Sequence, residues 1–244
     1  MYGLYRIADL NIGIHSLYDD VHPLCRNYRA TGNADIMIAV TQSEIDLERE
    51  RSVREDIIEG RPVRNYPDPY LETLAVYRRI AEKMPNHDTF LFHGSCIAVD
   101  GAAYLFTARS GTGKSSHTRL WRKLLGDRAM MVNDDKPLIR VSEAGAIVYG
   151  TPWDGKHHLS SNIAVPLRTV CILERAAENH IRGITPSEAL PMLLQQVYRP
   201  MNEAAMAQTL HLIDRLTGCV NLYRLGCNMD ISAAELSYNT MKGE

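Results

Sequence analysis

The sequence predicts an α/β protein with a mixed sheet and a small N-terminal β-rich lobe. Three observations predict it. Apolar and polar residues alternate near the N-terminus, a buried strand near the middle runs into a glycine-rich turn and an amphipathic helix, and short apolar strands alternate with helical patterns afterwards. We place the boundary near residue 85, with a lobe and its connector helix over 1–85 and a larger domain over 86–244.

Composition excludes several classes of protein. The 244 residues are 45% hydrophobic, enough for a good core, and carry a formal net charge of -2. Because no Lys/Arg run appears, we expect no nucleic-acid or membrane partner. No apolar run approaches the roughly 20 residues of a membrane span and no signal peptide is recognisable, which favours a cytoplasmic protein. Five cysteines without a Cys-x-x-Cys pair favour reduced thiols and argue against a structural zinc.

The N-terminal lobe shows period-two patterns. Leu10, Ile12 and Ile14 alternate with polar residues or glycine, and residues 36–40 do the same, which predicts strands of a half-exposed antiparallel sheet. Residues 44–64 are crowded with charge, which is typical of a solvated face or a hairpin. A connector then leads to helical spacing over 70–84.

The centre of the chain carries a strand, a turn and a helix in direct succession. Residues 104–107 are apolar, glycines follow, and residues 116–125 have a one-sided apolar stripe. Such a turn directs backbone amides around an anion, its lysine reaches outer phosphates, and its last serine can bind Mg²⁺. It is a Walker A pattern with Ala108 in place of the first glycine. The predicted nucleotide-binding residues are Ser110, Gly111, Thr112, Gly113, Lys114, Ser115 and Ser116.

An acidic pair follows the next strand. Residues 129–132 are apolar and end at Asn133, and Asp134 and Asp135 come directly after it. Phosphate-loop enzymes keep their metal and catalytic acids at this place. We choose Asp134 as the base that orients a hydroxyl, and Asp135 with Ser115 as the Mg²⁺ ligands, although the residues alone leave open which acid has which role.

The remaining elements follow regular patterns. Asp100-Gly101 suits a tight hairpin turn between two apolar runs, and residues 142–145 indicate a second hairpin. A polar loop over 150–158 comes next. Further strands are predicted over 169–173 and 222–225, and helices over 187–198, 203–216 and from 232 onward.

Several polar side chains outside the main motifs have open roles. Asp154, Lys156, His157 and His158 could contact an acceptor or serve only the loop, and two adjacent histidines on an extended segment point apart, which disfavours one zinc ion. The candidate transition-state cations are Arg175 and Arg199, and the candidate nucleotide contacts beside the turn are Arg109 and His117.

These features together carry a resemblance to a known family. His93-Gly94 opens the first hairpin, the turn begins fifteen residues later at Ala108, and Asp134-Asp135 follow. Residues 90–141 resemble the catalytic domain of the HPr serine kinase/phosphorylase family, relatives of ATP-dependent phosphoenolpyruvate carboxykinase, and the chain is similar to its stand-alone members, some of which phosphorylate a precursor peptide. The resemblance implies that Asp134 takes the proton of a serine hydroxyl, that His93 supports this base, and that Asp135 helps hold Mg²⁺. The Arg-Gly-Leu-Gly signature of phosphorolysis is absent, so phosphorylase activity is not implied.

The sequence therefore favours a kinase that uses Mg-ATP, or GTP, to phosphorylate a hydroxyl, with a serine of a peptide or small protein as the expected acceptor. Lys114 would draw charge from the transferred group. A small-molecule alcohol kinase and a nucleotide-binding sensor without turnover are the alternatives. Carboxykinase activity is disfavoured because no His and Lys set for a second metal is recognisable. Assembly into a homo-oligomer and the identity of the acceptor stay open.

Overall fold

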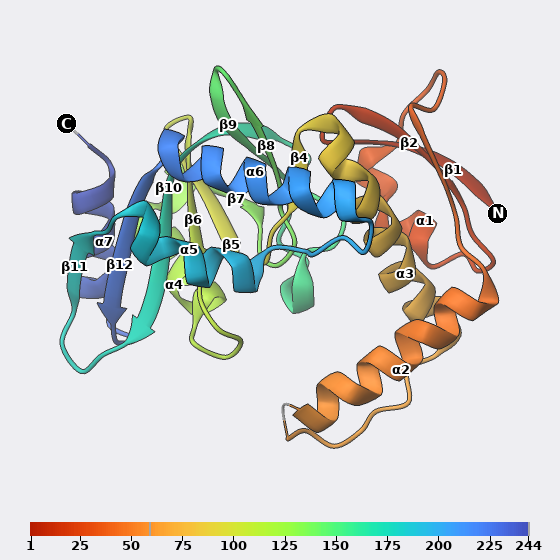
Figure 1. The fold of residues 1–244 in the computed structure, drawn as a ribbon. Helices are drawn as coiled ribbons and strands as arrows, with labels where there is room; N and C mark the ends of the chain where they lie inside the picture. The colour runs from red at the N-terminus through yellow and green to blue at the C-terminus, as the bar shows by residue number, and fades with distance from the viewer. Residues whose placement is uncertain (59, 244) are drawn as a thin grey trace. The chain divides into compact units, whose positions relative to one another are not determined.

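The computed structural model describes residues 1–58 and 60–243 (Figure 1). The chain divides into two compact units, Met1–Lys83 and Met84–Glu244, which are described one at a time. Within the described residues, no helix is both long enough and apolar enough to cross a membrane.

The first unit contains a three-stranded sheet in the order β1 (Tyr2–Ile7), β2 (Leu10–His15) and β3 (Ile36–Ala39). The first two strands form an antiparallel hairpin, whereas β3 runs parallel to β2. The expectation of a purely antiparallel sheet is therefore wrong for β3. The connection over 16–35, which contains the short helix α1 (Val21–Leu24) and a 3₁₀ turn (Arg26–Tyr28), is long enough to carry the chain back for a parallel pairing.

Two long helices complete this unit, α2 (Gln42–Ile58) and α3 (Asp68–Lys83). Most of the charged residues expected to form a solvated face or hairpin thus belong to a helix. Glu48 is buried within α2 and is neutralised by Arg51 at 2.5 Å and Arg78 of α3 at 2.8 Å. Because two arginines pair with Glu48, a helix rich in charged residues can pack against its neighbours. The description of the unit as β-rich needs correction, because its helices are longer than its strands.

The second unit is built on a curled mixed sheet of nine strands. They are β4 (Thr89–Leu91), β5 (Ser95–Val99), β6 (Ala102–Thr107), β7 (Ala129–Asn133), β8 (Leu138–Ser142), β9 (Gly145–Tyr149), β10 (Ala164–Arg175), β11 (His180–Gly183) and β12 (Asn221–Cys227). The order is β4-β8-β9-β10-β6-β5-β7, and β12 pairs with both β10 and β11. Among the described residues of this unit, only the pairings of β10 with β6 and with β12 are parallel.

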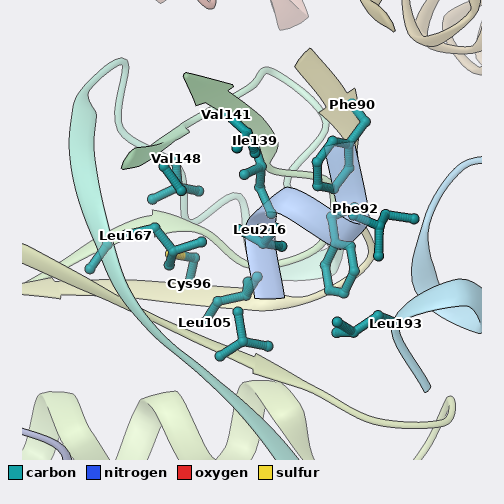
Figure 2. Packing of buried hydrophobic residues seen from close by; sticks show 14 of the residues in the cluster. Phe90, Phe92, Cys96, Leu105, Ile139, Val141, Val148, Leu167, Leu193 and Leu216 are labelled. Carbon is teal, nitrogen blue, oxygen red and sulfur yellow. The ribbon is translucent and has the colours of Figure 1, made fainter. Parts of the chain in front are cut away.

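Helices cover the central strands on both faces. They are α4 (Lys114–Leu125), α5 (Pro186–Gln196), α6 (Glu203–Cys219) and α7 (Ile231–Met241), and 3₁₀ turns lie at Met84–His87, Gly126–Arg128 and Gly155–His157. Alternate residues of the central strands enter two separate cores. Cys96 and Leu105 pack with residues of α5 and α6, such as Leu193 and Leu216 (Figure 2), whereas Phe106 packs with residues of α4 and α7. Burial on both faces is the reason why β5 and β6 are almost continuously apolar.

The register of the strands brings three segments with predicted site residues together: the start of β5, the end of β6 and the end of β7. The predicted hairpin turn is confirmed, since Asp100 and Gly101 have φ values of 50° and 81° between β5 and β6. Strand β5 runs antiparallel to both β6 and β7, pairing Ser95 with Phe106 and Cys96 with Asn133. The start of β5 therefore meets the ends of β6 and β7.

Candidate functional site

The glycine turn lies between β6 and α4, as the sequence predicts. Gly111 and Gly113 have φ values of 75° and 124°, which residues with a side chain rarely adopt. A Cβ atom added at either glycine would have no heavy atom within 4 Å. The turn is thus shaped for glycine and open on that side. Ala108, by contrast, is fully buried in the core with Trp121, which accounts for a small apolar residue at the first position.

Lys114 opens helix α4 and is buried. Its Nζ donates to the carbonyl oxygen of Ala108 at 3.1 Å, so the side chain folds back along the turn. Burial lowers the pKa of Lys114, against the opposing effect of Asp135. Gly113, the residue before the helix, provides no side-chain cap, and the first amides of α4 have no partner within the helix. The site therefore combines a cation with open backbone donors.

The acidic pair follows β7 in a turn held by Asn133, whose side chain is buried. Its Oδ1 accepts from the backbone amides of Asp135 at 2.8 Å and Lys136 at 2.6 Å, while its Nδ2 donates to the carbonyl oxygen of Thr151 at 3.0 Å. One carboxamide thus fixes the turn and ties it to the following loop.

Asp134 is directed toward the glycine turn. It is buried, and its Oδ1 accepts from the Ser95 hydroxyl at 2.5 Å, whose Oγ lies 2.8 Å from Oγ1 of Thr118. Burial raises the pKa of Asp134, while hydrogen bonds from Ser95 and Ser115 oppose the rise. Ser115, the last serine of the turn, therefore interacts with Asp134, the first acid of the pair.

Asp135 is directed elsewhere and is partly exposed. Its Oδ1 lies 3.3 Å from Nε2 of His93, and both its carboxylate oxygens accept from the Lys136 ammonium at 3.0 Å. Burial lowers the pKa of His93 to about 4, with further lowering from Lys136 and Lys114. His93 is therefore neutral at neutral pH, and its backbone is fixed by hydrogen bonds to Gln196 and Thr107.

These contacts pair the predicted residues in a different way. The sequence predicts His93 beside Asp134 and Ser115 beside Asp135, whereas the structure has His93 beside Asp135 and Ser115 beside Asp134. Consecutive residues in a turn direct their side chains differently, and Ser95 draws the first acid toward α4. Both pairs nevertheless lie close to Lys114, because the charges of Asp134 and Asp135 both raise its pKa against the effect of burial.

The loop over 150–161 lies against this cluster. Gly155 has a φ of 75°, and a Cβ atom on it would lie 3.2 Å from Cβ of Asp135. Asp154 is buried in the loop, and His157 is exposed but close enough for its charge to oppose the burial-driven rise in the pKa of Asp134. Trp153 is buried as well.

No protein-family model matches the chain, and no curated protein matches it. Among solved structures, a similar one is the Hpr(Ser) kinase/phosphatase from Coxiella burnetii, at 10% sequence identity and a TM-score of 0.33. That likeness covers 63% of this chain and 99% of the other. Similarity at this level leaves the family of the chain unassigned.

The other candidate residues divide between the site and the core. Arg175, at the end of β10, donates through Nη2 to the carbonyl oxygen of Gly111 at 2.5 Å and so reaches the glycine turn. Arg109 and Arg199 are exposed. The expectation that His117 contacts nucleotide is wrong, because it is buried against Phe106 and its Nε2 lies 3.0 Å from the Ser237 hydroxyl of α7.

Sequence reasoning missed Ser95, Thr118 and Asn133. The sequence contains a signal for Ser95 alone, because this serine follows His93 by two residues at the start of a strand.

Within residues 1–58 and 60–243 no group of three or more His, Cys, Asp or Glu side chains could hold a metal ion. The assembled residues can offer backbone donors, one buried lysine, two carboxylates and a serine hydroxyl to a ligand. Such a set suits a polyphosphate and a hydroxyl better than a metal held by protein alone.

Proposed function

We propose that the protein is a phosphotransferase of the P-loop, HPr-kinase-like type, which uses Mg-ATP to transfer the γ-phosphoryl group to a hydroxyl. A serine of a peptide or small protein is the proposed acceptor. The observation that carries this proposal is the meeting of Ser115 with Asp134 beside the buried Lys114. A binding protein without turnover would need the glycine turn but not a second, partly exposed carboxylate held by a neutral imidazole.

The glycine turn fits a triphosphate. Its two glycines leave the space in front of the backbone open, and the uncapped start of α4 offers amides and the positive end of a helix dipole. Lys114, Arg175 and the backbone amides from Ser110 to Ser116, apart from that of Thr112, which donates to the Arg109 carbonyl, would contact the phosphates. The Arg175 guanidinium, which now contacts the Gly111 carbonyl, adds a positive charge at the rim of the turn.

Ser115 and Asp134 fit Mg²⁺ because a hydroxyl and a carboxylate are oxygen ligands and here they face each other. Magnesium is usually held by few protein ligands, and phosphates supply others. The bound ion would supply charge neutralisation between the phosphates. Ser95 holds the Asp134 carboxylate in place from the opposite strand.

Asp135 suits the role of the group that accepts the proton of the acceptor hydroxyl. It is partly exposed, so a hydroxyl can approach it, and the neutral His93 can donate from Nε2 to fix its orientation. We therefore exchange the two acids: Asp135 accepts the hydroxyl proton and Asp134 binds the metal, whereas the family pattern suggests the reverse.

The test is transfer of label from γ-labelled ATP, with Mg²⁺, to size-separated fractions of a host extract. Wild type should label a peptide or protein fraction, and Lys114→Ala should label none. Lys123→Ala, which removes an exposed lysine of the same helix, is the matched control and should behave as wild type. Equal labelling by Lys114→Ala and wild type would exclude the proposed phosphate site. Label in small molecules other than inorganic phosphate, and in no larger fraction, would identify a metabolite alcohol as the acceptor.

A further inference from the structure

The loop over 150–161 is fastened to the strand that carries the acidic pair. The backbone amide of Ser161 donates to the carbonyl of Val132 at 3.2 Å, and the Asn133 carboxamide donates to Thr151. Gly150 closes the loop so tightly that a Cβ atom there would lie 1.9 Å from the carbonyl oxygen of Ser161. Both ends of the loop are therefore held next to the end of β7.

The loop also has a defined internal shape. The buried carboxylate of Asp154 accepts from the Ser160 hydroxyl at 3.0 Å and lies 3.1 Å from Nδ1 of His158. Gly155 and His158 both have positive φ values, 75° and 49°, the second of which is uncommon for a residue with a side chain. A buried acid inside a strained turn holds a conformation that an unconstrained surface loop would not keep.

The outer side of the loop carries basic side chains. Lys156, His157 and His158 are consecutive and exposed, and the turn that carries them packs against Asp135 through Gly155. Within the described part of the chain, neither Lys156 nor His157 forms an ion pair with a carboxylate. Asp154 is buried and engaged by His158 and Ser160. The loop thus presents an ammonium group and imidazole groups that can donate hydrogen bonds at the place where an acceptor would approach Asp135.

We infer that the 150–161 loop is the acceptor-binding element and that it selects a hydroxyl acceptor with an anionic group next to the hydroxyl. The inference rests on the proposed function and adds the substrate class. Lys156 and His157 attract the anionic group while Asp135 receives the hydroxyl proton, so that the two ends of the acceptor are recognised separately. The anionic group can be an acidic side chain beside a serine or the carboxylate of a small hydroxy acid, because the recognising chemistry is the same.

The experiment measures kcat/KM with acceptors that differ in charge. Three serine-centred peptide libraries have glutamate, alanine or lysine at the positions flanking the serine, and glycerate and glycerol form the small-molecule pair. The enzymes are wild type, the charge-reversed double variant Lys156→Glu with His157→Glu, the neutral double variant Lys156→Gln with His157→Gln, and Lys123→Glu. Lys123 is exposed on α4, outside the loop, and provides the matched charge reversal. The KM for Mg-ATP is measured in parallel.

Wild type and Lys123→Glu should prefer the anionic member of at least one acceptor series by about three- to tenfold, as expected from one exposed ammonium and a neighbouring imidazole acting together. The neutral variant should lose the preference and the reversed variant should invert it, and both changes should exceed any change in the KM for Mg-ATP, which His157 can affect through Asp134. Preference within the peptides identifies an acidic peptide, and preference for glycerate identifies a small hydroxy acid.

Two results would overturn the inference. If wild type used anionic and neutral acceptors equally, the inference of an anionic acceptor would be wrong, but the proposal of a kinase would be unaffected. A preference that survives charge reversal would show that another surface selects the acceptor. Absence of both transfer and ATP turnover with every acceptor would overturn the inference and the proposed function together.

Discussion

The Nε2 atom of His93 lies 3.3 Å from Oδ1 of Asp135, while the neighbouring Asp134 bonds to Ser95 and interacts with Ser115. Two consecutive carboxylates are thus placed in different surroundings, one beside Ser95 and Ser115 and the other beside His93 and Lys136. Burial raises the pKa of Asp134. Different surroundings are the usual means by which paired acids acquire separate roles.

The first prediction separates these two roles. Asp135→Asn should keep the affinity for Mg-ATP but lower the transfer rate by about 10²-fold or more, because it removes the proposed proton acceptor. Asp134→Asn should instead weaken Mg²⁺-dependent nucleotide binding. Titration of Mg-ATP binding alongside single-turnover transfer measures both effects. The opposite result, binding lost in Asp135→Asn and only transfer lost in Asp134→Asn, would restore the assignment that the family pattern implies.

Ser95 provides a second prediction, since it contacts Asp134 from another strand. Ser95→Ala should raise the Mg²⁺ concentration required for half-maximal nucleotide binding by about tenfold, because residues that orient a metal ligand commonly contribute 10- to 100-fold in affinity. Ser187→Ala, a change at an exposed position in α5, is the control. A metal requirement identical to that of wild type would show that Ser95 only fills the end of β5.

The local parts of the site could be predicted from the sequence. The turn from Ser110 to Ser115 and the acids after β7 depend on neighbours in the chain, and the structure has a strand, a turn and a helix at those places. The direction of each acid could not be predicted, because Ser95 and His93 approach from a different segment of the fold. Adjacent aspartates carry no periodic signal that would distinguish their surroundings.

Two other differences have separate physical causes. His117 is four residues before Trp121 and therefore belongs to the buried stripe of α4. The helical spacing indicates this burial, whereas nearness to the glycine turn alone suggests a nucleotide contact. Helix α2 is charged on nearly every side, so periodicity could not reveal it. Its buried Glu48 becomes acceptable only through Arg78 of another helix, which no local pattern shows.

His117 leads to a prediction about pH. Burial lowers its pKa to about 4, below the ordinary value of 6.5, so the unfolded chain takes up a proton before the folded chain does. The stability that depends on neutral His117 is complete above about pH 6.5 and is lost as the pH falls toward about 4. The loss approaches about 3 kcal/mol at most, from about 1.4 kcal/mol per pKa unit.

Urea unfolding at a series of pH values measures this loss. His117→Gln should have lower stability at pH 7, because it disturbs the contact with Ser237, but a flatter dependence on pH between 6.5 and 4. His211→Gln, a change at an exposed position of α6, should retain the wild-type slope. A variant at position 117 with the full wild-type slope would assign the pH dependence to other groups.

The last prediction concerns the closure of the 150–161 loop at Gly150. A Cβ atom there would lie 1.9 Å from the carbonyl oxygen of Ser161 and 2.7 Å from that of Val132, and both contacts are with backbone. Gly150→Ala should therefore lower the free energy of unfolding by about 3 kcal/mol or more, since neither the loop backbone at Ser161 nor β7 can move away without breaking the hydrogen bond between Ser161 and Val132. Gly183→Ala is the control, because a Cβ atom there meets nothing within 4 Å and its φ is not in the left-handed range. Urea unfolding of both variants should show a large decrease only for Gly150→Ala, and equal stabilities would mean that the loop does not close against β7 in solution.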